Sequence, residues 1–179
     1  MKGLLAFSRV VDAVNYRLGN VAEWLVLLSC LISAGNAFSR YAFGISSNAW
    51  LEIQWYMFAA VVLLGASYTL QKNEHVRVDI VYANVSTRRQ IGIDIFGFVL
   101  FMLPATAIMT YLSWPIFHNS WALGEISSNA GGLVRWPVKI FLPLGFALLT
   151  LQGVSELIKR VAMRNGHMPA NLHYERPLQ

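Results

Sequence analysis

The ionisable residues best suited to chemistry lie at the two ends of one uncharged segment. Glu52 comes directly before nineteen residues without a formal charge, and five ionisable residues follow them closely: Lys72, Glu74, His75, Arg77 and Asp79. Carboxylates and imidazoles are the groups that transfer protons and bind transition metals in proteins. Because no second His and no Cys accompanies them, these residues give only a weak metal signal. We expect no metal site in this chain.

Both ends of the segment also have structural explanations. Glu52 would lie in the first turn of a helix, where the helix dipole stabilises a carboxylate. It could instead pair across an interface with a basic residue, either Arg135 or an arginine of a partner. His75, Arg77 and Asp79 could form a solvated loop, or a polar network that fixes the ends of two helices. The sequence leaves these alternatives open.

Signatures of catalysis and of cofactor binding are missing from the sequence. It contains no nucleophile-elbow, Walker or dinucleotide-binding glycine motif. The four histidines fall at segment ends or near the C-terminus, whereas a bis-histidine haem in a helix bundle needs imidazoles in the core. We therefore expect no enzymatic activity and no cofactor. The alternative function is a membrane-anchor subunit of a respiratory or other membrane enzyme complex.

The composition indicates a membrane protein. The 179 residues are 56% hydrophobic and 13% charged, whereas a soluble domain carries about 25% charged residues. The net charge of +5 is spread between apolar runs and forms no single basic patch, which argues against nucleic-acid binding. The single cysteine, Cys30, excludes a disulfide within the chain and a cysteine metal site.

Four apolar segments can cross a bilayer as helices, because about 20 apolar residues span its hydrocarbon core. They cover residues 21–43, 53–71, 95–117 and 136–158. Eleven of the fourteen Lys and Arg residues lie on the side of the two termini and the loop between the second and third segments, and only Arg40, Arg135 and Lys139 lie on the opposite side. By the positive-inside rule, both termini are then cytoplasmic. The predicted fold is an all-α integral membrane protein with four transmembrane helices, N-in and C-in.

The chain divides into three predicted parts. Residues 1–19 place apolar side chains on one face of a helix and charged side chains away from it, which is typical of an amphipathic helix lying on membrane lipid. Residues 20–164 form the four-helix transmembrane domain. Residues 165–179 contain two prolines and no apolar period, so we expect a cytoplasmic tail.

Small and uncharged polar residues mark surfaces where these helices should meet others. Ser29, Ser33 and Ala37 recur every four residues, and such a stripe lets a second helix approach closely. The amides of Asn36 and Gln152 would be costly in lipid, so each should bond to a neighbouring helix. That neighbour could belong to this chain or to another subunit.

Three groups of residues resemble the small membrane subunit of TRAP (tripartite ATP-independent periplasmic) transporters. These groups are Asn48, Trp50 and Glu52 with Gly65 and residues 73–79, then residues 124–139, then residues 142–156. The resemblance covers most of the chain, and the family has the same four spans with both ends inside. Ile53 departs from the pattern, because many members carry a second acidic residue at that position.

The resemblance implies a supporting role in a sodium-driven, binding-protein-dependent transporter for organic acids (carboxylates). The small subunit would form a stable heterodimer with a large permease subunit in the bacterial inner membrane and act as its scaffold. A periplasmic solute-binding protein would be a transient partner. The candidate interface and structural residues are Ser29, Ser33, Asn36, Ala37, Asn48, Trp50, Glu52, Gly65, His75, Arg77, Asp79, Arg135 and Gln152.

Overall fold

The computed structural model describes residues 1–74 and 85–169, and this part of the chain is almost entirely helical. Its helices are α1 (Lys2–Phe43), α2 (Asn48–Lys72), α4 (Thr87–Gly97), the π-helical segment η1 (Phe98–Met102), α5 (Leu103–Ala122), α6 (Trp136–Lys139) and α7 (Phe141–Arg164). Four stretches are long and apolar enough to cross a membrane: Lys2–Phe43, Asn48–Lys72, Thr87–Ala122 and Trp136–Arg164. The described residues contain no strand, only an isolated bridge between Ile126 and Val134. The predicted all-α fold with four spanning helices is confirmed.

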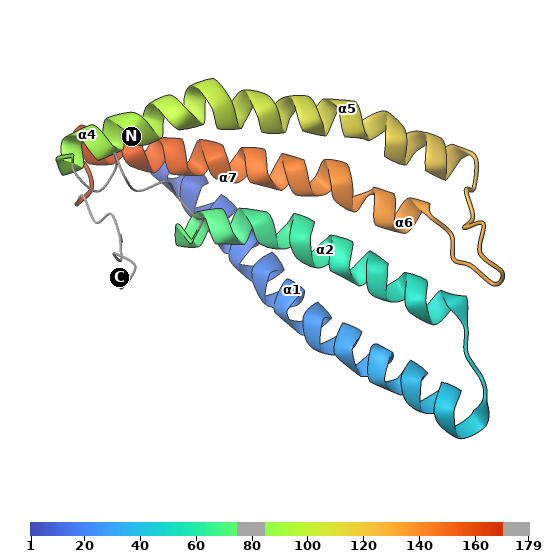
Figure 1. Ribbon diagram of the computed structural model, residues 1–179. Coiled ribbons are helices and arrows are strands. Elements are labelled where there is room, and N and C mark those ends of the chain that lie inside the picture. Colours follow the sequence, from blue (N-terminus) through green and yellow to red (C-terminus); the bar gives the residue numbers. More distant parts are fainter. Residues whose placement is uncertain (75–84, 170–179) are drawn as a thin grey trace.

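The helices run alongside one another with α7 in a central position (Figure 1). α7 contacts α1, α2 and α5, and α2 also contacts α1. Residue 2 of α1 and residue 164 of α7 lie at one end of the bundle, which we call the terminal end. The α1–α2 turn and the segment between α5 and α6 lie at the other, which we call the loop end. Toward the loop end α1 diverges from α7 and α5 (Figure 1).

Local sequence explains the tight turn between α1 and α2. Gly44 ends α1 with φ 68°, a left-handed conformation that glycine adopts without steric cost, and its N–H donates to the Arg40 carbonyl oxygen at 3.1 Å. Ser47 then begins α2, and its hydroxyl oxygen accepts a hydrogen bond from the Ala49 N–H at 3.3 Å. The first two spanning helices are thereby joined as a hairpin.

The third spanning stretch is continuous through a change of helix type. In η1 the Leu103 N–H donates to the Phe98 carbonyl, five residues earlier, which is the π-helical pattern. Pro104 follows at the start of α5 and has no N–H to donate. α4 and α5 therefore act as one rod from Thr87 to Ala122.

Two glycines permit close contact between helices. A Cβ added at Gly145 of α7 would lie 2.7 Å from the Leu63 Cβ on α2. One added at Gly19 of α1 would lie 2.4 Å from Cγ of the Tyr68 ring, also on α2. Both separations are shorter than packed atoms tolerate, so only glycine allows α2 to approach α7 and α1 at these points.

The interior of the bundle contains many polar side chains. Gln152 and Asn15 are the two largest fully buried side chains among the described residues. The apolar core beside them is small and consists of Ala60, Leu64 and Leu148. The bundle therefore depends on hydrogen bonds as well as on apolar packing.

The N-terminal stretch is part of α1 and continues without a break across residues 19 and 20. Leu4, Phe7 and Val14, from the face predicted to be apolar, are exposed on the surface of the chain. Ser8 and Asn15 are buried on the face that packs against the bundle. The division at residue 19 into an interfacial helix and a spanning domain remains a prediction.

Candidate functional site

The first polar cluster is centred on Glu52 at the loop end of the bundle. Glu52 lies in the first turn of α2 and is only 3% exposed. Its Oε1 accepts hydrogen bonds from the Ser127 hydroxyl and from Asn129 Nδ2, the latter at 2.7 Å. Its Oε2 accepts from the Leu133 backbone N–H at 2.7 Å. A single carboxylate thus holds both sides of the segment that joins α5 to α6.

These hydrogen bonds keep the carboxylate ionised. The pKa of Glu52 is held below its ordinary value, first by the Leu133 N–H and then by the Ser127 hydroxyl. Burial acts in the opposite direction, while Asn129 and the nearby charge of Arg135 lower the pKa further. Donors aimed at a carboxylate favour its charged form, and here they outweigh its removal from water.

The segment that surrounds Glu52 is itself ordered by short contacts. The Ser127 N–H donates to the Leu133 carbonyl at 2.9 Å, next to the Ile126–Val134 bridge. Gly132 packs so closely that an added Cβ would lie 2.5 Å from the Ser127 Cβ. The connection therefore presents its Ser127 hydroxyl and Leu133 N–H from one compact hairpin-like turn.

Two similar tetrapeptides meet in this cluster, residues 46–49 before α2 and residues 127–130 in the connection. Asn48 Nδ2 donates to the Ala130 carbonyl at 3.1 Å, which joins one tetrapeptide to the other. In the first, Ser47 is the helix cap that its residue type favours. In the second, Ser127 and Asn129 donate hydrogen bonds to the Glu52 carboxylate.

Arg135 pairs with Glu125 and not with Glu52. Arg135 Nη1 lies 3.6 Å from a Glu125 carboxylate oxygen, and Lys139 Nζ donates to the other oxygen. The hydrogen bond from Lys139 is the main reason that the pKa of Glu125 is lowered. Trp50 lies near the start of α2, at the loop end, and its side chain is half exposed. Its backbone carbonyl accepts a hydrogen bond from Gln54 Nε2.

The second polar cluster joins α1, α2 and α7 through three fully buried side chains. Asn15 Nδ2 donates to Gln152 Oε1 at 2.7 Å, and Ser67 Oγ donates to Asn15 Oδ1 at 2.9 Å. Both oxygens of the two amides are therefore used, and each helix of the three contributes one residue. Because lipid offers no hydrogen-bond partners, polar side chains within a membrane bundle must bond to one another in this way.

Asp12 of α1 extends this cluster toward the terminal end. It accepts from Gln152 Nε2 at 2.9 Å, from Ser155 Oγ at 3.1 Å and from Lys159 Nζ at 2.9 Å. Lys159 also donates to Glu156 at 2.6 Å. The charges of α1 and α7 are thus matched across their interface.

An ion pair closes the terminal end between α4 and α7. Arg160 Nε lies 2.8 Å from Asp94 Oδ2, and each of these side chains is 7% exposed. Arg160 Nη1 also lies 3.6 Å from Glu156 Oε2. Together with Asp12 and its partners, this pair connects three of the four spanning stretches in one charged network.

The remaining predicted residues lie apart from both clusters. Ser33 and Ala37 are exposed on the far half of α1, while Ser29 and Asn36 are half-buried there. Gly65 lies on α2 where an added Cβ would meet no atom within 4 Å. His75, Arg77 and Asp79 lie outside the described residues. In the stripe of Ser29, Ser33 and Ala37, this chain therefore partly buries Ser29 and leaves the other two residues exposed.

Ser8, Asp12, Asn15 and Ser67 were not predicted as site residues, although the sequence carries a signal for three of them. Ser8, Asp12 and Asn15 are spaced by four and three residues, which places them on one helix face. The prediction for this stretch rests only on its apolar and its charged residues. In the structure this face packs against α7.

The geometry of the two clusters suits structural support. Among residues 1–74 and 85–169, no group of three or more His, Cys, Asp or Glu side chains could hold a metal ion. Each buried carboxylate named above accepts hydrogen bonds from side chains or backbone of this chain. These groups are therefore engaged in holding helices and loops together.

Comparison with known families gives a match to the model described as Tripartite ATP-independent periplasmic transporters, DctQ component. The match covers residues 29–163, from the middle of α1 to the end of α7. It includes the Glu52 cluster and Gln152, and it begins after Asp12 and Asn15. No curated protein and no solved structure matches the chain in the corresponding comparisons.

Proposed function

This chain belongs to the DctQ component family of tripartite ATP-independent periplasmic (TRAP) transporters, and from that premise we propose that it is the scaffold of such a transporter. It is the small permease subunit, and its family works with a large permease and a binding protein. Our proposal is that the two permease subunits form a stable heterodimer in the bacterial inner membrane. The solute-binding protein would dock only transiently.

The observation that carries the scaffold proposal is the network between Asn15, Gln152, Ser67 and Asp12. In a transport domain that moves, polar groups must exchange partners. Here the side chains bond to one another across three helices, which holds these helices in one arrangement. The Glu52 cluster ties the loop end in the same way. A bundle fixed at both ends is suited to resist the movement of a partner.

The remaining features of the proposal come from the family and from the charge pattern. We infer that transport is driven by a sodium gradient, that the substrates are organic acids, and that this chain catalyses no reaction. Both termini would lie in the cytoplasm, with residues 1–19 at the lipid interface and residues 165–179 as a tail. Trp50, Glu52 and the stripe of Ser29, Ser33 and Ala37 would lie at or near the contact with the large subunit.

Co-purification and reconstitution test the proposal together. The tagged chain is expressed with the large subunit of the same transporter and extracted in mild detergent, and we expect a one-to-one complex. The complex is then reconstituted with the solute-binding protein, and uptake of dicarboxylates and 2-oxo acids is measured with and without a sodium gradient. We expect sodium-dependent uptake that disappears when this chain is omitted. Equal uptake by the large subunit alone would refute the scaffold role.

A further inference from the structure

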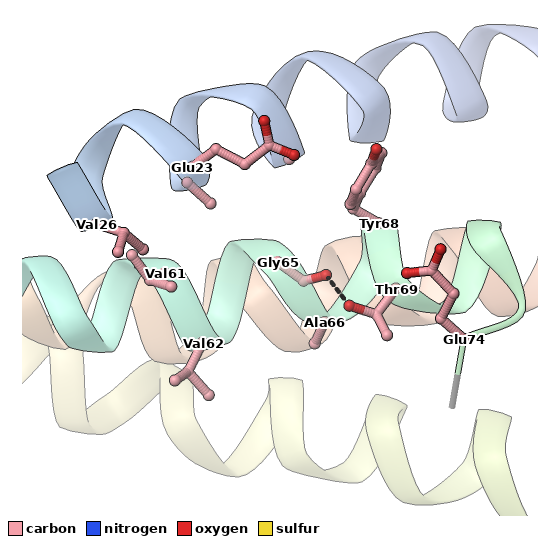
Figure 2. Close-up of a pocket in the computed structure, with 11 residues that line it drawn as sticks. Glu23, Val26, Val61, Val62, Gly65, Ala66, Tyr68, Thr69 and Glu74 are labelled. Atoms are coloured by element: carbon pink, nitrogen blue, oxygen red, sulfur yellow. Dashed lines mark hydrogen bonds between the residues drawn. The ribbon is translucent and has the colours of Figure 1, made fainter. Parts of the chain in front are cut away.

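A groove between α1 and α2 has the shape and charge of a docking site for a helix. Its volume is about 370 Å³, and Val26 of α1 with Val61 and Val62 of α2 form apolar walls. Gly65 and Ala66 line it with almost no side chain (Figure 2). The groove faces outward, because Val26 and Val62 are each about half exposed.

Two carboxylates line the same groove toward the terminal end. Glu23 extends from α1, and Glu74 follows the end of α2 (Figure 2). Within residues 1–74 and 85–169, neither carboxylate has a hydrogen-bond or ion-pair partner. The ammonium of Lys72 lies 5.5 Å from the ring centroids of Tyr16 and Tyr68, and it pairs with neither carboxylate although the Tyr68 ring lines the groove. In a chain with a net charge of +5, an acidic groove stands out as a local exception.

The charge of the groove identifies the chemistry of its occupant. By the charge count, Glu23 and Glu74 lie at the cytoplasmic ends of their spans, where membrane proteins concentrate Lys and Arg. A neighbouring transmembrane helix would therefore bring cations to the level of these carboxylates. An anionic phospholipid headgroup brings a net negative charge, which carboxylates repel.

We propose that the α1–α2 groove receives a transmembrane helix of the large permease subunit, and that a Lys or Arg at the cytoplasmic end of that helix pairs with Glu23. This proposal rests on the proposed function, because it requires the heterodimer. The apolar walls of the groove contact the apolar side chains of the partner helix, and Gly65 lets the backbone of that helix approach closely. The ion pair with Glu23 fixes the position of the partner helix along the membrane normal. Glu74 adds negative charge at the mouth of the groove.

Gly65 offers a substitution that fills the groove without disturbing this chain. An added Cβ at Gly65 meets no atom of the protein within 4 Å, so Gly65→Leu should fold normally and block the partner helix. Gly92 of α4 has the same open surroundings and does not line the groove, which makes Gly92→Leu the matched control. Glu23→Gln tests the charge with little change in shape.

The experiment measures retention of the large subunit by the full-length chain during affinity purification, at a series of detergent concentrations. We expect Glu23→Gln to weaken retention at least about tenfold, as loss of a buried charge pair does. Gly65→Leu should weaken retention at least about tenfold as well, because its side chain fills the groove. Gly92→Leu should behave as wild type. Thermal unfolding of each variant alone confirms that it is folded. Charge reversal at Glu23 should be rescued by one Lys→Glu or Arg→Glu change at a cytoplasmic helix end of the large subunit.

Cross-linking locates the occupant directly. Ala66→Cys is introduced into a Cys30→Ser background, since Cys30 is exposed and would compete for the reagent. We expect a cross-link from position 66 to one helix of the large subunit, and none from a cysteine at position 92. Wild-type retention by both Gly65→Leu and Glu23→Gln would overturn the groove proposal and leave the heterodimer standing. If the Gly65→Leu and Glu23→Gln variants keep the large subunit but lose bound phospholipid, the groove binds lipid, and the groove proposal is overturned in that case too. Failure of the wild-type pair to co-purify would instead refute the proposed function.

Discussion

Asn15 Nδ2 lies 2.7 Å from Gln152 Oε1, and this contact joins the first spanning helix to the last. Ser67 reaches the same Asn15 from α2, so three helices meet at one amide. All three side chains have no exposed surface. The packing of α1 onto the bundle therefore depends on matched hydrogen bonds at a depth where water cannot replace them.

Removing one member of this contact should be costly. We expect Asn15→Ala to destabilise the protein by about 1–3 kcal/mol, because Gln152 Oε1 would be left buried without its donor. Denaturation of the purified chain in detergent measures the loss. Gln54→Ala is the control, since the Gln54 amide bonds only to the Trp50 carbonyl on its own helix. Equal effects of the two substitutions would show that the three-helix contact adds nothing.

Low pH should release the connection between α5 and α6. The pKa values of Glu52 and Glu125 are below the ordinary value of 4.5, so their ionised forms favour the folded loop. This contribution is complete above about pH 4.5 and is lost as the pH falls through the lowered values. Limited proteolysis of residues 126–134 between pH 7 and pH 3.5 follows the release.

Glu52→Gln is the matched variant for that experiment. Glutamine keeps the shape of Glu52 but has only one oxygen to accept the three hydrogen bonds. We expect faster cleavage of the connection already at pH 7 and a weaker dependence on pH. A pH profile in Glu52→Gln identical to that of wild type would assign the effect to other groups.

The pair of Arg160 and Asp94 should show a large difference between single and double replacement. Removing Arg160 takes the 2.8 Å contact from the buried Asp94 carboxylate and the charge beside Glu156, and we expect Arg160→Met alone to destabilise the protein by about 3–5 kcal/mol. Replacing both residues, as Arg160→Met with Asp94→Leu, should restore much of the loss. A double-mutant cycle in detergent measures the coupling, and additive effects would contradict the importance of the 2.8 Å contact.

Gly145 should resist even the smallest substitution. The Cβ of Gly145→Ala would meet the Leu63 Cβ at 2.7 Å and the Leu63 carbonyl oxygen at 2.8 Å, so α7 and α2 must separate. We expect a loss of about 1–3 kcal/mol. Gly97→Ala is the control, because its Cβ meets nothing within 4 Å and alanine favours a helix interior. Comparison of the two unfolding midpoints checks the prediction.

The number and type of the spanning helices could be predicted because each depends only on its own residues. Apolar length fixes a span whatever lies next to it. The Ser47 cap belongs to the same class of local feature, since the residue acts on an N–H two positions away.

The partners of Glu52 and of Asn15 could not be predicted, because they depend on how distant segments align. Ser127 is 75 residues from Glu52, and its companion Asn129 resembled an ordinary turn residue. The sequence predicts that the charged residues of the N-terminal stretch point away from its apolar face, without indicating what they contact. The polar face of α1 packs in the bundle because Gln152 and Ser155 on α7 offer it hydrogen bonds.

The separation of 137 residues between Asn15 and Gln152 has a consequence for how the protein is made. α1 is synthesised first, and Ser67 of α2 reaches Asn15 early, but Asn15 Nδ2 and Asp12 find their partners only on α7, the last helix. Until then the growing chain carries a polar face that is only partly covered. Completion of α7 is therefore the step that satisfies this face and locks the first helix onto the last.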